Sequence, residues 1–228
     1  GLHHHQSTDK LAPAFSEAFL REKMMEIHPD DLPLKPGQSR QQLVDFVAGQ
    51  LFNPLIAPKR VEQDPGRDLL LSSACNYYED VTEAEATAFY AAKAATDPMR
   101  PPSWGLNSKL TKKDDRIVEQ VYYADGRYGR AIRKIVTQLD RAAHYAENEL
   151  QRKIISKLIA FYECGDLTIF DQYSILWVQD TDSTIDFVNG FIEVYGDPLG
   201  HHGAWQSVVS MRDEEASVRM GKISSMAG

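Results

Sequence analysis

The stretch from residue 132 to residue 165 constrains the fold most, because its apolar residues recur every three or four positions and so mark one face of a helix. The first half of this stripe consists of Ile132, Ile135, Leu139, Ala142 and Ala146. The second half consists of Leu150, Ile154, Leu158 and Phe161, and it stops at Gly165, a residue suited to a left-handed cap. The pattern fits one long helix or two helices with a break near Glu147-Asn148-Glu149. Either way, the chain must build a core against this stripe.

Another helix is predicted from about Asp166 to Gln179, and its aromatic residues are expected in the core. After Ser183 the apolar period changes to about two, which indicates a strand. One face of that strand is expected to carry Ile185, Phe187, Phe191, Glu193 and Tyr195. A second strand is predicted over 204–211, so that 197–203 forms the loop of an antiparallel hairpin. A short helix is expected to begin at 213–215 and to end at Gly221.

The first half of the chain alternates helices with Pro-containing loops. Helices are predicted over 13–27 and from the N-cap Ser39 to Pro54. Thr82 and Glu85 form a capping box that predicts a helix to about Ala95. Leu69 to Leu71 is expected to be a short buried segment. The segments 105–111 and 116–123 are predicted to form a β-hairpin.

These elements predict an α+β fold that is mostly helical, with a small antiparallel β-sheet or part of a β-barrel. We expect a helical N-terminal part over 1–104. The part over 105–228 is expected to hold the β-hairpins and the long helices. At 228 residues, the chain is long enough to bury a sizeable core.

Composition argues against several classes of protein. A net charge of -8 and the absence of a basic stripe disfavour nucleic acid as a partner. No run of about eighteen apolar residues is present, so no membrane-spanning helix is expected. The two cysteines, Cys75 and Cys164, are too few for a disulfide framework. Each is expected to be a small buried apolar residue. The cytoplasm is favoured only mildly.

No catalytic motif is complete in this sequence. The zinc motif H-E-x-x-H, the nucleophile motif G-x-S-x-G and the common phosphate-binding loops are all absent. The histidines at 3–5 and at 201–202 are consecutive in the chain. Consecutive side chains of a helix or strand point in different directions, so neither set is expected to converge on a single metal ion. His144 is expected to be solvated or to cap a helix. We therefore expect no metal bound by this chain and no active site built from it alone.

The segment Gly190-Phe-Ile-Glu-Val-Tyr-Gly-Asp-Pro-Leu-Gly200 contains the best candidate site. It places Glu193 two residues before Tyr195 on the predicted strand. An acid flanked by aromatic residues is partly desolvated and needs a positive partner. One interpretation is an internal salt bridge to Lys or Arg. The other is recognition of a ligand ammonium, with the Tyr195 hydroxyl donating to a nearby oxygen.

This eleven-residue segment is similar to one in the dipeptidyl peptidase III family of zinc exopeptidases, particularly its bacterial members. The resemblance covers most of the chain. It continues in Trp177-Val-Gln-Asp-Thr-Asp182, in Trp205-Gln-Ser-Val-Val209 and in the long helical stretch 123–146. It also includes Asn76-Tyr77-Tyr78, Gly105-Leu-Asn-Ser-Lys-Leu110 and Gly1-Leu-His-His-His5. The last of these is otherwise explained as the remnant of a purification tag.

The resemblance implies a two-lobed enzyme that releases dipeptides from the free N-terminus of short peptides. In that family one lobe holds zinc on an H-E-x-x-G-H helix with a later Glu, and the other lobe binds the peptide. Glu193 matches the acid that holds the peptide ammonium. Tyr195 matches the phenol that stabilises the oxyanion in the transition state. Gln206 stands where an acidic residue is expected in many relatives.

The zinc ligands of that family have no counterpart in this sequence. The chain is therefore expected to be an internal piece of the non-zinc lobe, inactive by itself. Its expected partners are short peptides and the remainder of the parent polypeptide, and zinc is expected in the parent only. The alternative is a non-catalytic peptide-binding or scaffold domain that never had a zinc lobe.

Overall fold

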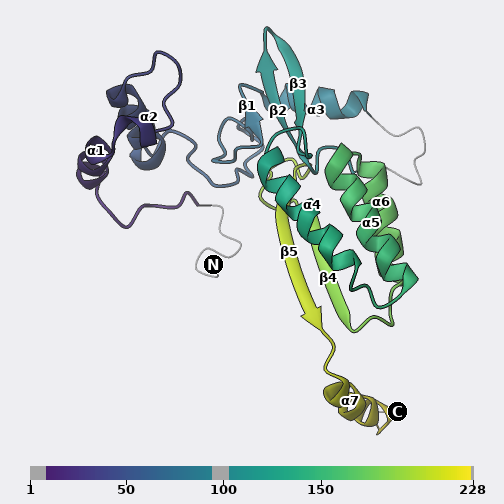
Figure 1. Ribbon diagram of the computed structural model, residues 1–228. Coiled ribbons are helices and arrows are strands. Elements are labelled where there is room, and N and C mark those ends of the chain that lie inside the picture. The colour runs from purple at the N-terminus through teal and green to yellow at the C-terminus, as the bar shows by residue number, and fades with distance from the viewer. Residues whose placement is uncertain (1–8, 94–102, 227–228) are drawn as a thin grey trace.

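The computed structural model describes residues 9–93 and 103–226 and has the predicted α+β composition (Figure 1). Its helices are α1 (Glu17–Glu26), the short 3-10 helix η2 (Pro29–Asp31), α2 (Arg40–Phe52), α3 (Glu83–Ala92), α4 (Gly129–Ala143), α5 (Glu149–Cys164), α6 (Leu167–Gln179) and α7 (Glu214–Met226). Its strands are β1 (Tyr78–Glu79), β2 (Ser108–Lys113), β3 (Arg116–Val121), β4 (Ile185–Glu193) and β5 (Ala204–Met211). The expected end of the third helix at Ala95, the prolines of 98–102 and the segment 1–5 lie outside the described residues.

Local capping interactions start the helices where the sequence predicts them. The Ser39 side chain accepts from the amide of Gln42, whose side chain accepts from the Ser39 amide. Thr82 and Glu85 form the same reciprocal pair at the start of α3. Each pair satisfies backbone donors that the first turn of a helix leaves free. The predicted capping box at Thr82 is therefore confirmed.

The long helical stripe forms two helices, not one. The first helix, α4, ends at Ala143, and Asn148 caps α5 by accepting from the amide of Gln151. Gly165 ends α5 in the left-handed conformation at φ 75°, as its position predicts. The main core lies among these helices and the neighbouring strands. Its buried members are Tyr122, Ile132, Ile154, Leu158, Phe161, Tyr162, Leu167, Phe170, Tyr173 and Phe191.

The first sheet contains three strands in the order β1-β2-β3. The β2–β3 hairpin is antiparallel and turns at Asp114 and Asp115, which both adopt positive φ. Strand β1 pairs parallel to β2, with Tyr78 opposite Leu110. The predicted hairpin is thus confirmed, but the sheet is mixed because a short segment from far earlier in the chain joins its edge.

Strands β4 and β5 form a separate two-stranded antiparallel ribbon that runs alongside α4, α5 and α6 (Figure 1). The ribbon does not continue to Tyr195 as predicted, because β4 ends at Glu193. A bulge also interrupts the register: Phe191 pairs with Trp205, whereas Glu193 pairs with the adjacent Ala204. Cross-strand partners share a face and neighbours alternate, so the extra residue places Glu193 on the face opposite Phe191. The expectation that these two residues share a face is therefore wrong.

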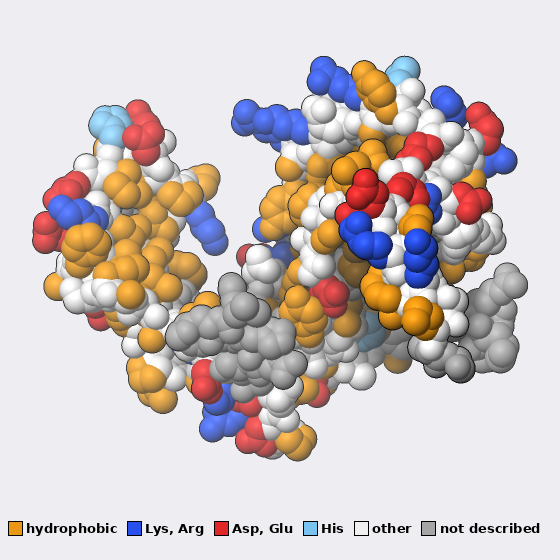
Figure 2. Space-filling view, turned by 90° about the horizontal axis from the view of Figure 1, so that it is seen from below, with side chains coloured by type: hydrophobic (Ala, Val, Ile, Leu, Met, Phe, Trp, Pro, Cys, Tyr) orange, Lys and Arg blue, Asp and Glu red, His pale blue; other side chains and the backbone are white. Residues whose placement is uncertain are grey.

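The two ends of the chain lie away from the main core. Helices α1 and α2 pack on each other at one side of the molecule (Figure 1), and hydrophobic side chains gather across that lobe (Figure 2). Helix α7 follows the ribbon and has no buried residue. It continues through Gly221 to Met226, so the predicted stop is wrong. Glycine in an exposed helix costs about 1 kcal/mol relative to alanine, which does not suffice to end it.

A second core joins both predicted parts of the chain. Its buried members are Leu70, Val81, Ala86, Tyr90 and Leu110. The boundary between 104 and 105 stays a prediction. Cys164 is exposed and Cys75 is half-buried, so the expectation of two buried cysteines is wrong for Cys164. Within the described ranges, no helix has the length and apolar character needed to span a membrane.

Candidate functional site

Glu193 is the last residue of β4 and its side chain is half-buried. In the part of the chain that the structure describes, no Lys or Arg forms an ion pair with this carboxylate. The internal salt bridge considered above is therefore not formed there. A half-buried carboxylate without a protein cation is suited to accept from a charged donor outside the chain.

Tyr195 lies just beyond the strand, in a tight turn. The amide of Asp197 donates to the carbonyl of Val194 at 2.9 Å, which closes a four-residue turn with Tyr195 at its second position. The Tyr195 side chain is 72% exposed. The structure therefore brings Glu193 and Tyr195 to the same end of the ribbon, with the phenol projecting into solvent.

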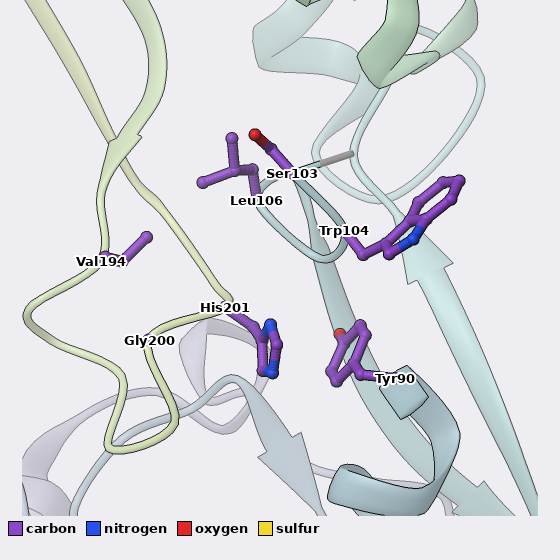
Figure 3. Close-up of a pocket in the computed structure, with 7 residues that line it drawn as sticks. All are labelled: Tyr90, Ser103, Trp104, Leu106, Val194, Gly200 and His201. Atoms are coloured by element: carbon purple, nitrogen blue, oxygen red, sulfur yellow. The ribbon is translucent and has the colours of Figure 1, made fainter. Parts of the chain in front are cut away.

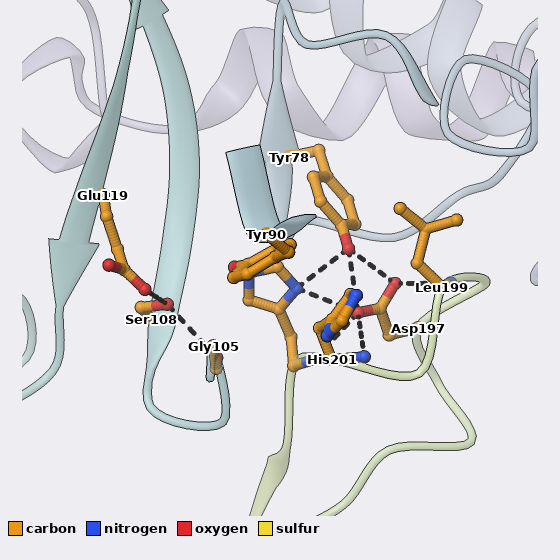
Figure 4. Close-up of polar contacts among 9 residues, drawn as sticks. Tyr78, Tyr90, Gly105, Ser108, Glu119, Asp197, Leu199 and His201 are labelled. Atoms are coloured by element: carbon orange, nitrogen blue, oxygen red, sulfur yellow. Dashed lines mark hydrogen bonds and ion pairs between the residues drawn. The ribbon is translucent and has the colours of Figure 1, made fainter. Parts of the chain in front are cut away.

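The carboxylate of Asp197 organises the loop that follows. Its oxygens accept from the amides of Leu199 at 3.0 Å, His201 at 2.9 Å and His202 at 2.8 Å. They also accept from the Tyr78 hydroxyl at 2.9 and 3.0 Å, which reaches across from β1 (Figure 4). Asp197 thus gathers its own loop and fixes it to the first sheet.

The imidazole of His202 completes this arrangement. His202 Nδ1 lies 2.9 Å from Asp197 Oδ2, and Nε2 lies 3.0 Å from the Tyr90 hydroxyl on α3. Because an ionised carboxylate only accepts, Nδ1 carries a proton toward Asp197. The side chains of Asp197 and His202 are both fully buried. We call Asp197, His202, Tyr78 and Tyr90 the loop clamp.

The electrostatics of the loop clamp favour the ionised carboxylate. Burial alone would raise the pKa of Asp197, but hydrogen bonds from His202 and the backbone amides hold that pKa below its usual range. Burial, followed by the charge of Asp197, raises the pKa of Tyr78. Burial likewise raises the pKa of Tyr90. The two phenols therefore stay protonated at neutral pH, and Tyr78 donates to Asp197.

Two cavities border this loop. The first, of about 320 Å³, lies between the loop residues Val194, Gly200 and His201 and the opposite wall of Tyr90 and Trp104 (Figure 3). His201 and Tyr90 stack with ring centroids 4.1 Å apart. The second cavity, of about 380 Å³, is mainly apolar. Its aromatic lining consists of Tyr77, Tyr122, Tyr128, Phe191 and Trp205.

The described residues do not fit a metal centre. No group of three or more His, Cys, Asp or Glu converges anywhere in 9–93 or 103–226. The Asp197–His202 pair uses its carboxylate and both ring nitrogens in hydrogen bonds within the protein. Burial raises the pKa of the Cys75 thiol to about 11, so it is not a ready thiolate ligand or nucleophile. His144 caps α4, as expected.

The loop clamp has no signature in the sequence. The pattern places Asp197 in a predicted loop, and His202 stands beside His201 as a consecutive pair unsuited to one metal. The partners Tyr78 and Tyr90 lie more than a hundred residues earlier in the chain. The available signal was a polar Asp and His inside a loop next to an apolar strand, which does not reveal burial by itself.

Comparisons with known proteins identify the family of this chain. The model of peptidase family M49 matches residues 79–228, well over half of the chain. Dipeptidyl peptidase 3 from Dictyostelium discoideum is 32% identical over 113 residues, which cover 50% of this chain and 16% of that protein. The human dipeptidyl peptidase 3 is 28% identical over 144 residues, which cover 62% of this chain and 19% of the human protein.

Solved structures show the same fold. The structure of dipeptidyl peptidase III from Caldithrix abyssi superposes with a TM-score of 0.53 at 18% identity, covering 91% of this chain and 36% of that one. The dipeptidyl-peptidase III from a Corallococcus strain gives a TM-score of 0.51 with the same coverage. This chain thus spans about a third of the solved structures and less than a quarter of the curated relatives. Since the family model covers well over half of the chain, including Glu193 and Tyr195, the chain belongs to peptidase family M49, the dipeptidyl peptidase III family.

Proposed function

We propose that this chain is a substrate-binding segment of a peptidase that releases dipeptides from the free N-terminus of short peptides. The observation that carries the proposal is the pairing of a half-buried Glu193, without a cation partner among the described residues, with an exposed Tyr195 on a hydrogen-bonded turn. Both belong to a segment inside the region matched by the family model.

Glu193 is proposed to hold the ammonium of the peptide. A carboxylate at a fixed strand end accepts hydrogen bonds from the charged N-terminus. This contact fixes how many residues of the peptide lie between its N-terminus and the scissile bond. A peptide bound this way cannot extend past Glu193. The same contact therefore supplies affinity and limits the product to a fixed length.

Tyr195 is proposed to donate a hydrogen bond to the carbonyl oxygen of the scissile bond. That oxygen gains negative charge only as the bond is attacked, so an oriented O–H stabilises the transition state more than the bound substrate. The 72% exposure of Tyr195 leaves its hydroxyl accessible to a peptide. Zinc and the groups that activate water are proposed to come from other parts of the parent enzyme.

The role of Glu193 is tested in the complete enzyme with Glu193→Ala. Loss of the ammonium partner should raise KM for peptides with a free N-terminus by about tenfold or more. N-acetylated analogues, which lack the charge, should be affected much less. Asp186→Ala is a matched control, because Asp186 is an exposed carboxylate on the same strand. An equal loss on acetylated and free peptides would count against ammonium recognition.

The role of Tyr195 is tested with Tyr195→Phe, which removes the hydroxyl and keeps the ring. We expect kcat to fall by about a hundredfold with a small change in KM. An unchanged kcat would remove Tyr195 from the transition state.

The alternative of a non-catalytic peptide-binding or scaffold domain is separated by the coding sequence. An H-E-x-x-G-H motif encoded downstream supports the peptidase, and a stop codon close after Gly228 supports the alternative. The 228-residue chain alone should release no dipeptide from an arylamide substrate. Clear turnover by this chain would show that its own residues suffice for hydrolysis.

A further inference from the structure

We propose that the loop clamp is a positioning device for Tyr195, with Asp197 and Tyr78 as its key residues. The inference rests on the proposed function and deepens it, because it names the residues that hold the phenol in place without touching the substrate.

The first step is the link between Asp197 and the turn. The backbone amide of Asp197 closes the turn that carries Tyr195, and the side chain of the same residue is anchored in the protein. The turn therefore has no independent freedom at its C-terminal end. Its N-terminal end is also fixed, because Glu193 is paired with Ala204 in the ribbon.

The second step is the attachment of the anchor to the rest of the molecule. Tyr78 ties the carboxylate to β1, and His202 ties it to Tyr90 on α3. The amide of Gly203 also donates to the carbonyl of Leu106 at 2.9 Å. The loop is thus held from two elements that do not belong to the ribbon.

The third step is the contrast between Tyr195 and its support. The phenol is 72% exposed, whereas Asp197 and His202 are 4% and 0% exposed. An exposed side chain on a flexible loop samples many positions, and a displacement of about 1 Å from the productive geometry lowers a rate by up to about a hundredfold. Burying a saturated polar network two residues away restricts that motion.

The loop clamp is built from polar side chains and not from apolar ones. Apolar packing of similar volume often stabilises a fold as well as a buried charged pair does. A fully satisfied network of directional hydrogen bonds instead selects one loop conformation. We therefore expect the clamp to contribute to the rate of the reaction through Tyr195, in addition to its contribution to stability.

The test is a double-mutant cycle in the complete enzyme, with kcat and KM measured on a dipeptidyl arylamide. Tyr78→Phe removes one hydroxyl from the clamp and leaves the ring against His202. It is expected to lower kcat about three- to tenfold with KM within about twofold. In the Tyr195→Phe background, the same change should lower kcat no further, because the group that it positions is gone.

Tyr162→Phe serves as the matched control. Tyr162 is fully buried, whereas Tyr78 is half-buried, and the Tyr162 hydroxyl is bonded to Asn189 and Trp205 of the ribbon. Its loss should reduce stability and leave kcat within about twofold. If Tyr78→Phe is too unstable to purify, Tyr90→Phe, which removes the hydroxyl beside His202 Nε2 and Ser108, is taken through the same cycle.

The outcomes separate the two proposals. If Tyr195→Phe lowers kcat and Tyr78→Phe multiplies that loss, or behaves like Tyr162→Phe, the positioning role is overturned and the proposed function stands. If Tyr195→Phe leaves kcat unchanged, the proposed role of Tyr195 is overturned and the positioning role with it. Loss of the Tyr78→Phe effect in the Tyr195→Phe background supports both.

Discussion

The two ends of the β4–β5 ribbon differ in how they are held. At the end near Glu193, the connecting loop is fixed by a buried carboxylate, a buried imidazole and two phenols from elsewhere in the chain. At the other end, Ile185 pairs with Met211, and these side chains are 46% and 75% exposed. At that end Glu147 accepts from the amides of Thr184 and Ile185, and Gln151 of α5 donates to the carbonyl of Ile185. The two ends thus differ in burial: a buried polar network holds the end with the candidate site, and exposed strand residues lie at the other end.

This difference shows that strand pairing alone does not fix the site. The same ladder of hydrogen bonds runs through both ends, but only the end near Glu193 is joined to the first sheet and to α3. The loop clamp therefore gives the candidate site a support that the strands themselves do not provide. Changes at the two ends should have unequal effects on stability.

The largest expected effect is that of Asp197→Ala. This change leaves the His202 imidazole, the Tyr78 hydroxyl and three amides without their acceptor, and we expect a loss of about 3–5 kcal/mol in the free energy of unfolding. Met211→Ala at the other end, where the side chain is 75% exposed, should change the free energy of unfolding by less than about 0.5 kcal/mol. Urea unfolding of both variants measures the contrast. Equal effects would mean that the clamp does not distinguish the two ends.

Two glycine substitutions should change the free energy of unfolding by smaller amounts and in opposite directions. A Cβ at Gly190 would lie 2.7 Å from the ring of Phe170, whereas a Cβ at Gly221 meets nothing within 4 Å. Gly190→Ala should therefore lower the free energy of unfolding by about 1–3 kcal/mol through overpacking. Gly221→Ala should favour the exposed α7 by about 0.5–1 kcal/mol and increase the helical signal in circular dichroism. A stabilising Gly190→Ala would contradict the close packing of the ribbon on α6.

The smallest expected effect is a pH dependence that belongs to Asp197. Its burial is outweighed by the bonds from His202 and the amides, so its folded-state pKa lies below the unfolded value of about 3.9. Its stabilisation is therefore present above about pH 4 and is lost as the pH falls through the folded-state pKa. The Asp197→Asn variant removes this one titrating group. It keeps the neighbouring titratable residues, which are Tyr78, Tyr90, His201 and His202.

The measurement is the midpoint of thermal unfolding between about pH 6 and about pH 3 for the wild type and for Asp197→Asn. The midpoint should fall further for the wild type than for Asp197→Asn as the pH is lowered. Other carboxylates, such as Glu85 with its pKa of about 2, titrate in both proteins and cancel in the difference. If the midpoints of the two proteins fell in parallel with pH, the ionised Asp197 carboxylate would not stabilise the folded protein.

Much of the fold follows from interactions close in sequence. The caps at Ser39, Thr82 and Gly165 involve residues within one turn, and each helix begins or ends where those residues predict. The β4–β5 hairpin follows from an alternating pattern and a Pro/Gly loop. The end of the strand did not follow, because alternation continues to Tyr195 although pairing stops at Glu193.

The site was predictable only in part. The residues themselves indicate Glu193 and Tyr195 as a candidate site, the resemblance supplies their expected roles, and the structure places them at one end of the ribbon. The loop clamp depends on contacts between residues 119 and 112 positions apart, which no local pattern encodes. The parallel pairing of β1 with β2 has the same origin. Such contacts come from the folded arrangement and not from periodicity.

The bulge between Phe191 and Glu193 has a consequence for how this segment tolerates insertions and deletions. Regular alternation would place Glu193 on the same face as Phe191, so the extra residue of the bulge is what turns the carboxylate to the opposite face. Removal of that extra residue would leave the acid opposite Ala204, on the face that it already occupies. A one-residue deletion in the bulge should therefore disturb the site less than the replacement of Glu193 by alanine.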